Sequence, residues 1–230
     1  MEPVALVFAP HPDDAEIGMG ATISALISQG VRVVVVDLTD GEPTPYGSVE
    51  IRKNETHNAS SILGITERRL LGITNRAVFD TIENRRSVAA VIREYRPEII
   101  FAPYWEDAHP DHVQACTLIE AGRFYGKFVK SDLPFEPYYP RRVLHYFSTH
   151  LRPRFLPSFI FDVSGHLDRK MDAIVAYKSQ FVVHPGNAAR LDAIRREALF
   201  WGDQISTEAG EPFVCRESLR ITEVKALFSV

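Results

Sequence analysis

The sequence has few cysteines, no excess of positive charge and no long hydrophobic run. Its 230 residues include two cysteines, Cys116 and Cys215, which are too few for a multi-disulfide scaffold and form no CxxC pair. Lysine and arginine total 26 against 30 acidic residues, which disfavours nucleic acid or an anionic membrane as a partner. No apolar run approaches the ~20 residues that span a bilayer, so we expect no membrane association.

The beginning of the chain and its composition predict a cytoplasmic protein. Glu2 stands where a signal peptide would carry positive charge. Hydrophobic residues make up 45% of the chain and charged residues 24%, which is typical of globular proteins and argues against long disorder. We find no internal repeat. A single domain over residues 1–230 is therefore predicted.

Short apolar runs alternate with helical patterns over residues 1–126. The run at residues 4–9 lacks polar alternation, as expected of a strand covered on both faces, and residues 31–38 give the strongest strand signal in the chain. Gly30 and Gly64 predict the ends of two of the intervening helices. The alternation predicts an α/β fold, with a Rossmann-like, doubly wound, mostly parallel sheet that has helices on both faces and strand order 3-2-1-4. The four predicted strands are residues 4–9, 31–38, 68–71 and 98–102.

After Gly126 the pattern loosens, and prolines punctuate the chain. Two short strands, at 143–147 and 159–163, are followed by helices at about 167–179 and 188–201. We interpret residues 127–230 as a C-terminal extension that caps the Rossmann-like core and walls its site, rather than as a unit that folds alone.

Histidine and aspartate are concentrated in two short segments, one directly after the first predicted strand and one in the connection that follows the fourth. The segments read His11-Pro12-Asp13-Asp14 and His109-Pro110-Asp111-His112. Each follows a strand that ends in Phe-Ala-Pro, although 98 positions (109 minus 11) separate them. Strands 1 and 4 are neighbours in the expected sheet, and ligands usually bind in the crevice beyond the carboxyl ends of such strands. The pattern therefore predicts that the two segments meet in space.

Together the segments offer three imidazoles and three carboxylates, which are the ligand types of a first-row divalent metal site. A catalytic site needs an open position, so these six side chains cannot all bind one ion. The simplest division assigns His11, Asp14 and His112 to the metal. Asp13 then takes the proton of the attacking water, and a protonated His109 stabilises the oxyanion.

In this scheme Asp111 would orient one of the histidines. The reaction that these roles predict is the hydrolysis of an amide or ester. A plainer interpretation is that both segments are helix caps, because aspartate and proline are common at helix N-termini. Two copies at neighbouring strand ends, each with a further aspartate or histidine, favour the metal site.

The same segments resemble the signature motifs of a known family. Residues 11–20, HPDDAEIGMG, and residues 109–112, HPDH, are similar to the two motifs of the PIG-L/LmbE-like deacetylases. The resemblance implies a zinc-dependent N-acetylglucosamine deacetylase. It implies these roles: zinc at His11, Asp14 and His112, Asp13 as general base, His109 as acid or electrophilic partner, and Arg52 as a substrate contact.

Two further features resemble one branch of that family. Residues 177–181, YKSQF, are similar to the bacterial enzymes that act on N-acetylglucosaminyl malate in bacillithiol synthesis. The family commonly has glutamate after the aspartate pair, and Ala15 at that position favours the same branch. The resemblance thus implies a small N-acetylated amino sugar as the substrate and a homo-oligomer as the assembly.

Several alternatives stay open. Fe²⁺ or another divalent ion could occupy the same ligands, because the affinity order alone does not select the metal. The chain could also be an amidase for an acylated small molecule that is not a sugar, or a metal-bearing binding protein without turnover. A dinucleotide site is disfavoured because Gly18 and Gly20 come too late after the first strand, so we expect them to allow close packing. His150 could line the pocket, and Arg152 and Arg154 would suit a substrate carboxylate.

Overall fold

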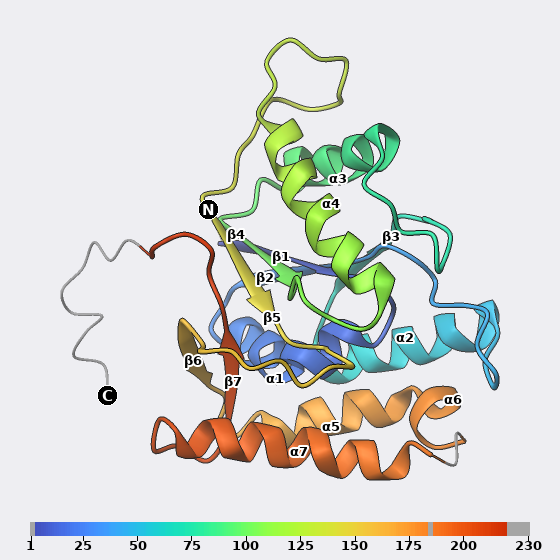
Figure 1. The fold of residues 1–230 in the computed structure, drawn as a ribbon, viewed down its shortest axis with the longest axis vertical. Coiled ribbons are helices and arrows are strands. Elements are labelled where there is room, and N and C mark those ends of the chain that lie inside the picture. Colours follow the sequence, from blue (N-terminus) through green and yellow to red (C-terminus); the bar gives the residue numbers. More distant parts are fainter. Residues whose placement is uncertain (1–2, 184–185, 220–230) are drawn as a thin grey trace.

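Five parallel strands form the centre of the molecule (Figure 1), and the computed structural model describes residues 3–183 and 186–219. The sheet order is β3-β2-β1-β4-β5, which confirms the predicted α/β fold and extends the predicted order by one strand. The strands are β1 (Val4–Ala9), β2 (Arg32–Asp37), β3 (Glu67–Leu70), β4 (Ile99–Pro103) and β5 (Arg142–Tyr146).

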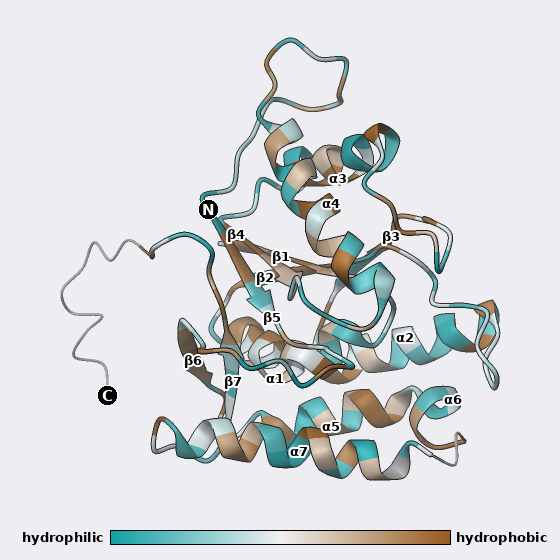
Figure 2. Ribbon diagram, viewed as in Figure 1, coloured by the Kyte–Doolittle hydropathy of each residue, from teal (hydrophilic) through white to brown (hydrophobic). Residues whose placement is uncertain are grey.

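Helices cover both faces of this sheet, because the strand side chains on each face are apolar. Leu6 and Phe8 of β1 belong to the core under α3 (Ile82–Tyr95) and α4 (Pro110–Gly126). Val7 points the other way, into the core under α1 (Asp14–Ser28) and α2 (Val49–Leu63). All three side chains are fully buried. Figure 2 shows β1 and β4 in the brown of hydrophobic residues between the two helix layers.

The C-terminal part of the chain adds a further layer below α1 and α2 (Figure 1). Helix α5 (Leu167–Ala176) packs against α1 and α2, and α7 (Ala188–Asp203) packs beside α5. Strands β6 (Phe159–Asp162) and β7 (Gly210–Phe213) form a small antiparallel pair. No helix among the described residues is long and apolar enough to cross a membrane.

The structure differs from the sequence prediction in three elements of this region. The strand predicted at 143–147 is β5, which pairs with β4 in the main sheet instead of standing outside it. The helix predicted at 167–179 is broken at Tyr177, which separates α5 from the short α6 (Lys178–Phe181). Strand β7 was not predicted, because its sequence Gly-Glu-Pro-Phe has little strand character and is held by pairing with β6. The division of the chain at residue 126 stays a prediction.

The strand order creates the crevice in which the site lies. From β1 the chain crosses to β2 on one side, and from β4 it crosses to β5 on the other, so the connections diverge between β1 and β4. Helix α1 begins directly after the loop that follows β1, and α4 begins at Pro110. Gly18 lets α1 approach the sheet closely, because a Cβ there would lie 2.2 Å from the Tyr146 ring. The packing role predicted for Gly18 is therefore confirmed.

Candidate metal centre

The two histidine–aspartate segments lie together at the carboxyl ends of β1 and β4. The ring centroids of His11 and His109 are 4.8 Å apart, and those of His11 and His112 are 5.3 Å apart. His109 stands directly before α4, and His112 lies in its first turn. Residues 98 positions apart therefore face one another, as the strand order predicts.

Three side chains in this cluster direct ligand atoms toward a common point. Asp14 Oδ2 lies 3.1 Å from His11 Nδ1 and 3.3 Å from His112 Nε2. The ligand atoms of the three residues lie within 4.8 Å of one another. Asp14 and His112 are buried, and the His11 side chain is 12% exposed. This spacing suits three ligands of one small cation.

The other ring nitrogen of His11 and of His112 is held by a carboxylate. His11 Nε2 donates to Asp111 Oδ2 at 3.1 Å, and His112 Nδ1 donates to Asp107 Oδ2 at 2.7 Å. Asp111 is itself fixed by the backbone N–H groups of Arg76 and Val78. A carboxylate on the outer nitrogen sets the tautomer and leaves the inner nitrogen free for a metal. Both inner nitrogens face Asp14, so the donor set fits a divalent ion.

The proton affinities of these groups support the same fit. Burial lowers the pKa of His11, but its hydrogen bonds to Asp111 and Asp14 outweigh burial and raise that pKa to about 9. Asp14 and Asp107 likewise overcome the burial of His112 and raise its pKa to about 10. Although burial favours the neutral acid, the two histidines hold the pKa of Asp14 well below its ordinary value. Without a metal, His11 and His112 therefore both carry a proton at neutral pH. A divalent cation bound between them supplies the same two positive charges in place of those protons.

Asp13 stands beside the ligand set in a strained backbone conformation. Its φ is 118°, in the left-handed region that aspartate adopts more readily than most residues. Arg52, which is 4% exposed, donates to Asp13 Oδ2 and to the Pro12 carbonyl, each at 3.0 Å. Burial raises the pKa of Asp13 to about 7 and Asp14 adds to the rise, while Arg52 opposes it. A carboxylate with a pKa near neutrality is suited to general base catalysis.

His109 differs from the other two histidines in its protonation. Its Nδ1 accepts the backbone N–H of Asp111 at 3.2 Å, so the proton of the neutral ring lies on Nε2. Burial and the nearby His112 and His11 lower the pKa of His109 to about 4. The ring is therefore neutral at neutral pH, and not protonated as expected from the sequence, and its Nε2 carries the proton.

Comparison with known proteins shows the family of this chain. Residues 6–121 match the PIG-L family model, described as GlcNAc-PI de-N-acetylase. The chain belongs to the PIG-L family. It is 35% identical over 191 residues to the diacetylchitobiose deacetylase of Thermococcus kodakarensis, covering 76% of this chain and 69% of that protein.

Two more similar proteins cover most of the chain. A probable N-acetyl-alpha-D-glucosaminyl L-malate deacetylase 2 of Bacillus cereus is 30% identical over 196 residues, covering 78% of this chain and 84% of that protein. The crystal structure of a conserved protein of Thermus thermophilus matches with a TM-score of 0.88 and 34% identity, over 96% of this chain and 98% of that one. The resemblance seen in the sequence is thus confirmed.

The structure of this PIG-L chain adds site residues that the sequence analysis did not single out. Asp107 orients His112, and the Ser148 hydroxyl donates to Asp14 Oδ1 at 2.6 Å. Ser148 lines a cavity of about 400 Å³ over these three candidate ligands. His150 lines the same cavity, which confirms the pocket position that the sequence predicted for it. One signal was available: residues 148–150, Ser-Thr-His, follow directly on the strand that becomes β5, whose carboxyl end lies at the same sheet edge as that of β4.

Proposed function

We propose that the chain is a metal-dependent deacetylase that hydrolyses the N-acetyl group of an N-acetylglucosamine-type substrate to acetate and a free amine. Membership of the PIG-L family and the two deacetylase relatives support this activity. The observation that carries it is the pairing of a three-residue ligand set with an adjacent carboxylate whose pKa is about 7.

The ligands of the proposed ion are His11, Asp14 and His112. A divalent cation held there supplies Lewis-acid chemistry, because it polarises a carbonyl and lowers the pKa of water. Imidazole and carboxylate donors suit Zn²⁺, and Fe²⁺ binds to the same donor types.

The remaining residues manage the protons and the developing charge. Asp13 accepts a proton from the water that attacks the acetamide carbon and then delivers it to the leaving nitrogen. The Nε2–H of His109 donates to the carbonyl oxygen as that oxygen becomes negative. Asp111 positions His11, and Arg52 holds Asp13 in place, so Arg52 acts on the base as well as lining the substrate cavity. The reaction consumes one water and releases acetate and the amine.

The test combines metal content with acetate release from N-acetylglucosaminyl malate and from free N-acetylglucosamine. We expect about one metal per chain and acetate release that chelation abolishes and added metal restores. Bound metal without acetate release from either sugar would favour the amidase for non-sugar substrates, and a chain without metal would refute the proposal. The cytoplasmic location and homo-oligomeric state stay predictions.

Two variants separate the roles of the ligands and the base. Asp13→Asn should keep the metal and lose turnover by roughly 10²- to 10⁴-fold, since it removes the proton acceptor and leaves the ligands in place. His112→Ala should lose both metal and turnover. Near-normal activity of the Asp13→Asn protein would show that another group is the base.

A further inference from the structure

Helix α1, which carries the proposed ligand Asp14, is broken at Met19. The backbone of Met19 has φ −153° and ψ 26°, so α1 consists of a first segment, residues 14–18, and a second segment that starts at Gly20. At Gly20 a Cβ would lie 3.1 Å from Lys170 Cγ, and at Gly18 it would meet the Tyr146 ring. Both glycines beside the break are therefore packed against the part of the chain after residue 126.

A carboxylate from β7 accepts the N–H groups that follow the break. In an unbroken helix, Ala21 and Thr22 would donate to the carbonyls four residues earlier. Here the Ala21 N–H donates to Glu211 Oε1 at 3.2 Å, and the Thr22 N–H donates to Glu211 Oε2 at 2.7 Å. A side chain that enters the helical hydrogen-bond ladder bends the helix, and negative charge is favourable at a helix N-terminus. Glu211 therefore caps the second segment of α1.

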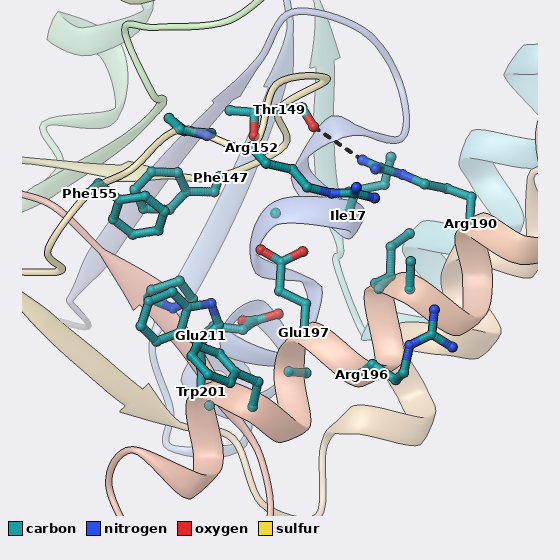
Figure 3. Close-up of a pocket in the computed structure, with 18 of the residues that line it drawn as sticks. Ile17, Phe147, Thr149, Arg152, Phe155, Arg190, Arg196, Glu197, Trp201 and Glu211 are labelled. Atoms are coloured by element: carbon teal, nitrogen blue, oxygen red, sulfur yellow. Dashed lines mark hydrogen bonds between the residues drawn. The ribbon is translucent and has the colours of Figure 1, made fainter.

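Glu211 lies beside the site but outside the cavity over the metal ligands. Figure 3 shows it at a second cavity, of about 410 Å³, which it lines together with Ile17. Ile17 belongs to the first segment of α1 and also lines the cavity over the metal ligands. Glu211 Oε1 lies 2.6 Å from Lys170 Nζ of α5, and both residues are buried. Any effect of Glu211 on the metal site must therefore pass through α1.

The first segment of α1 depends on its contacts for its direction. Residues 14–18 make little more than one helical turn, which has little stability of its own. At the start of the segment, Asp14 Oδ1 accepts the Ser148 hydroxyl at 2.6 Å. At its end lies the break that Glu211 caps. Without Glu211, the N–H groups of Ala21 and Thr22 would regain helical acceptors, and α1 would straighten through Met19.

We propose that Glu211 is a positioning residue for the metal centre: it holds the break in α1 and so fixes the direction from which Asp14 reaches the ion. The inference rests on the proposed function, because Asp14 is a ligand only if the chain binds the metal. A straightened α1 would displace Asp14 relative to His112, which stands on the separate helix α4. Lys170 supplies the charge that balances Glu211, so the ion pair and the cap have separable roles.

The test separates the cap from the ion pair. The double variant Glu211→Met/Lys170→Met removes the acceptor of the two N–H groups and leaves no unpaired charge in the interior. The single variant Lys170→Met is the matched control, because it keeps the acceptor and leaves Glu211 without its cation. Replacing a whole buried ion pair by apolar side chains costs little stability, whereas removing one partner costs much. We expect the urea midpoint of the double variant to stay closer to that of the wild type.

Metal affinity should follow the opposite order. In the double variant, the dissociation constant of Zn²⁺ should rise about 10- to 100-fold, the range for groups that orient a metal ligand. Competition with a chromogenic chelator measures this rise. The visible absorption spectrum of the Co²⁺-loaded protein, which reports ligand geometry, should change as well. Lys170→Met should keep the affinity and the spectrum of the wild type. Wild-type affinity in the double variant, or affinity that falls in step with stability in both variants, would overturn the positioning role.

Failure of the proposed function gives a different result. If metal binds and no acetate is released, the comparison of metal affinities still decides the role of Glu211. If the wild-type chain binds no metal, the deacetylase proposal fails, and hydrogen exchange of the metal-free protein decides instead. Residues 14–18 should then exchange faster in the double variant than in Lys170→Met, because the cap beyond them is lost. Exchange in the double variant as slow as in the wild type would overturn the inference.

Discussion

At the scale of single residues, Asp107 determines which ring nitrogen of His112 faces Asp14. Its Oδ2 accepts from His112 Nδ1, while its Oδ1 accepts the backbone N–H groups of His150 and Leu151 at 2.7 and 3.1 Å. The side chain is fully buried. Because Oδ1 is fixed by the backbone, only Oδ2 can set the His112 tautomer.

Asp107→Asn should therefore weaken metal binding. The amide oxygen would keep the backbone contacts, and the amide N–H₂ would face His112 Nδ1 and shift the ring proton to Nε2. We expect metal affinity to fall about 10- to 100-fold, as measured by competition with a chromogenic chelator. Glu106→Gln is the control, since it removes the same charge from an exposed neighbouring residue. An unchanged affinity in Asp107→Asn would show that the tautomer is set elsewhere.

Arg52 sets the proton affinity of the base. Its positive charge favours the ionised form of Asp13, so its removal should raise the Asp13 pKa, by about 1 unit or more. Activity requires ionised Asp13, and the acid limb of the kcat/KM profile of Arg52→Gln should move to higher pH. Arg52→Lys keeps the charge and should show the smaller displacement. If kcat/KM of Arg52→Gln is lower at every pH while its acid limb stays at the same pH, Arg52 acts only by contacting the substrate.

The residues visible in the sequence are those that carry the reactive groups themselves. His11, Asp14 and His112 stand in compact segments at strand ends, so strand order alone brings them together. Asp107 and Ser148 lie in loops outside the two motifs. The backbone contacts that hold Asp107, and the contact of Ser148 with Asp14, depend on the path of the chain after β5. The pKa of His109 could not be predicted either, because it depends on burial and on two neighbouring imidazoles.

At the scale of secondary-structure elements, one buried arginine ties β3 to α1 and β2. Arg68 of β3 is 2.5 Å from Glu16 of α1 and 2.6 Å from Asp37 of β2. Tyr177, between α5 and α6, also donates to Glu16 Oε1, at 3.1 Å. This network explains why residue 177 interrupts the predicted helix: its side chain is buried against α1.

Arg68→Met should destabilise the fold strongly, because it leaves the carboxylates of Glu16 and Asp37 buried without their cation. We expect a loss of about 3–5 kcal/mol in the free energy of unfolding, measured in urea. The neighbouring Arg69→Met is a matched control on the opposite face of β3, where Arg69 is 39% exposed and pairs with Glu94. Its loss should not exceed about 1 kcal/mol. Equal losses in the two variants would contradict the stabilising role of the network.

Elements built from strong local patterns were predicted well, and those held by distant partners were not. The valine-rich β2 and the glycine-terminated α2, whose Gly64 has a φ of 82°, follow from their own sequences. Strand β7 forms only because it pairs with β6, which its own sequence does not reveal. The cavities beside the site depend on the path of the C-terminal part of the chain.

At the scale of the whole molecule, the proposed metal links segments that are distant in the chain. Its proposed ligands come from the loop after β1 and from the first turns of α1 and α4, and Ser148 from the C-terminal part contacts Asp14. A ligand that binds only the folded state stabilises it, by about 2.7 kcal/mol at 100 times its dissociation constant. For a chain of this size, metal should raise Tm by about 5–10 °C.

This rise in Tm should increase with pH. In the metal-free chain the pKa values of His11 and His112 are raised from 6.5 to about 9 and about 10. Protonation of these histidines therefore stabilises the folded state fully below about pH 6.5, and this stabilisation is lost as the pH rises through 9 and 10. Metal binding displaces both protons, so its affinity should rise up to about 100-fold per pH unit below pH 9. Thermal unfolding with and without Zn²⁺ at pH 6, 7 and 8 tests this. His112→Ala should show little Zn²⁺-dependent rise in Tm at any of these pH values, and a wild-type rise independent of pH would place the bound ion away from these histidines.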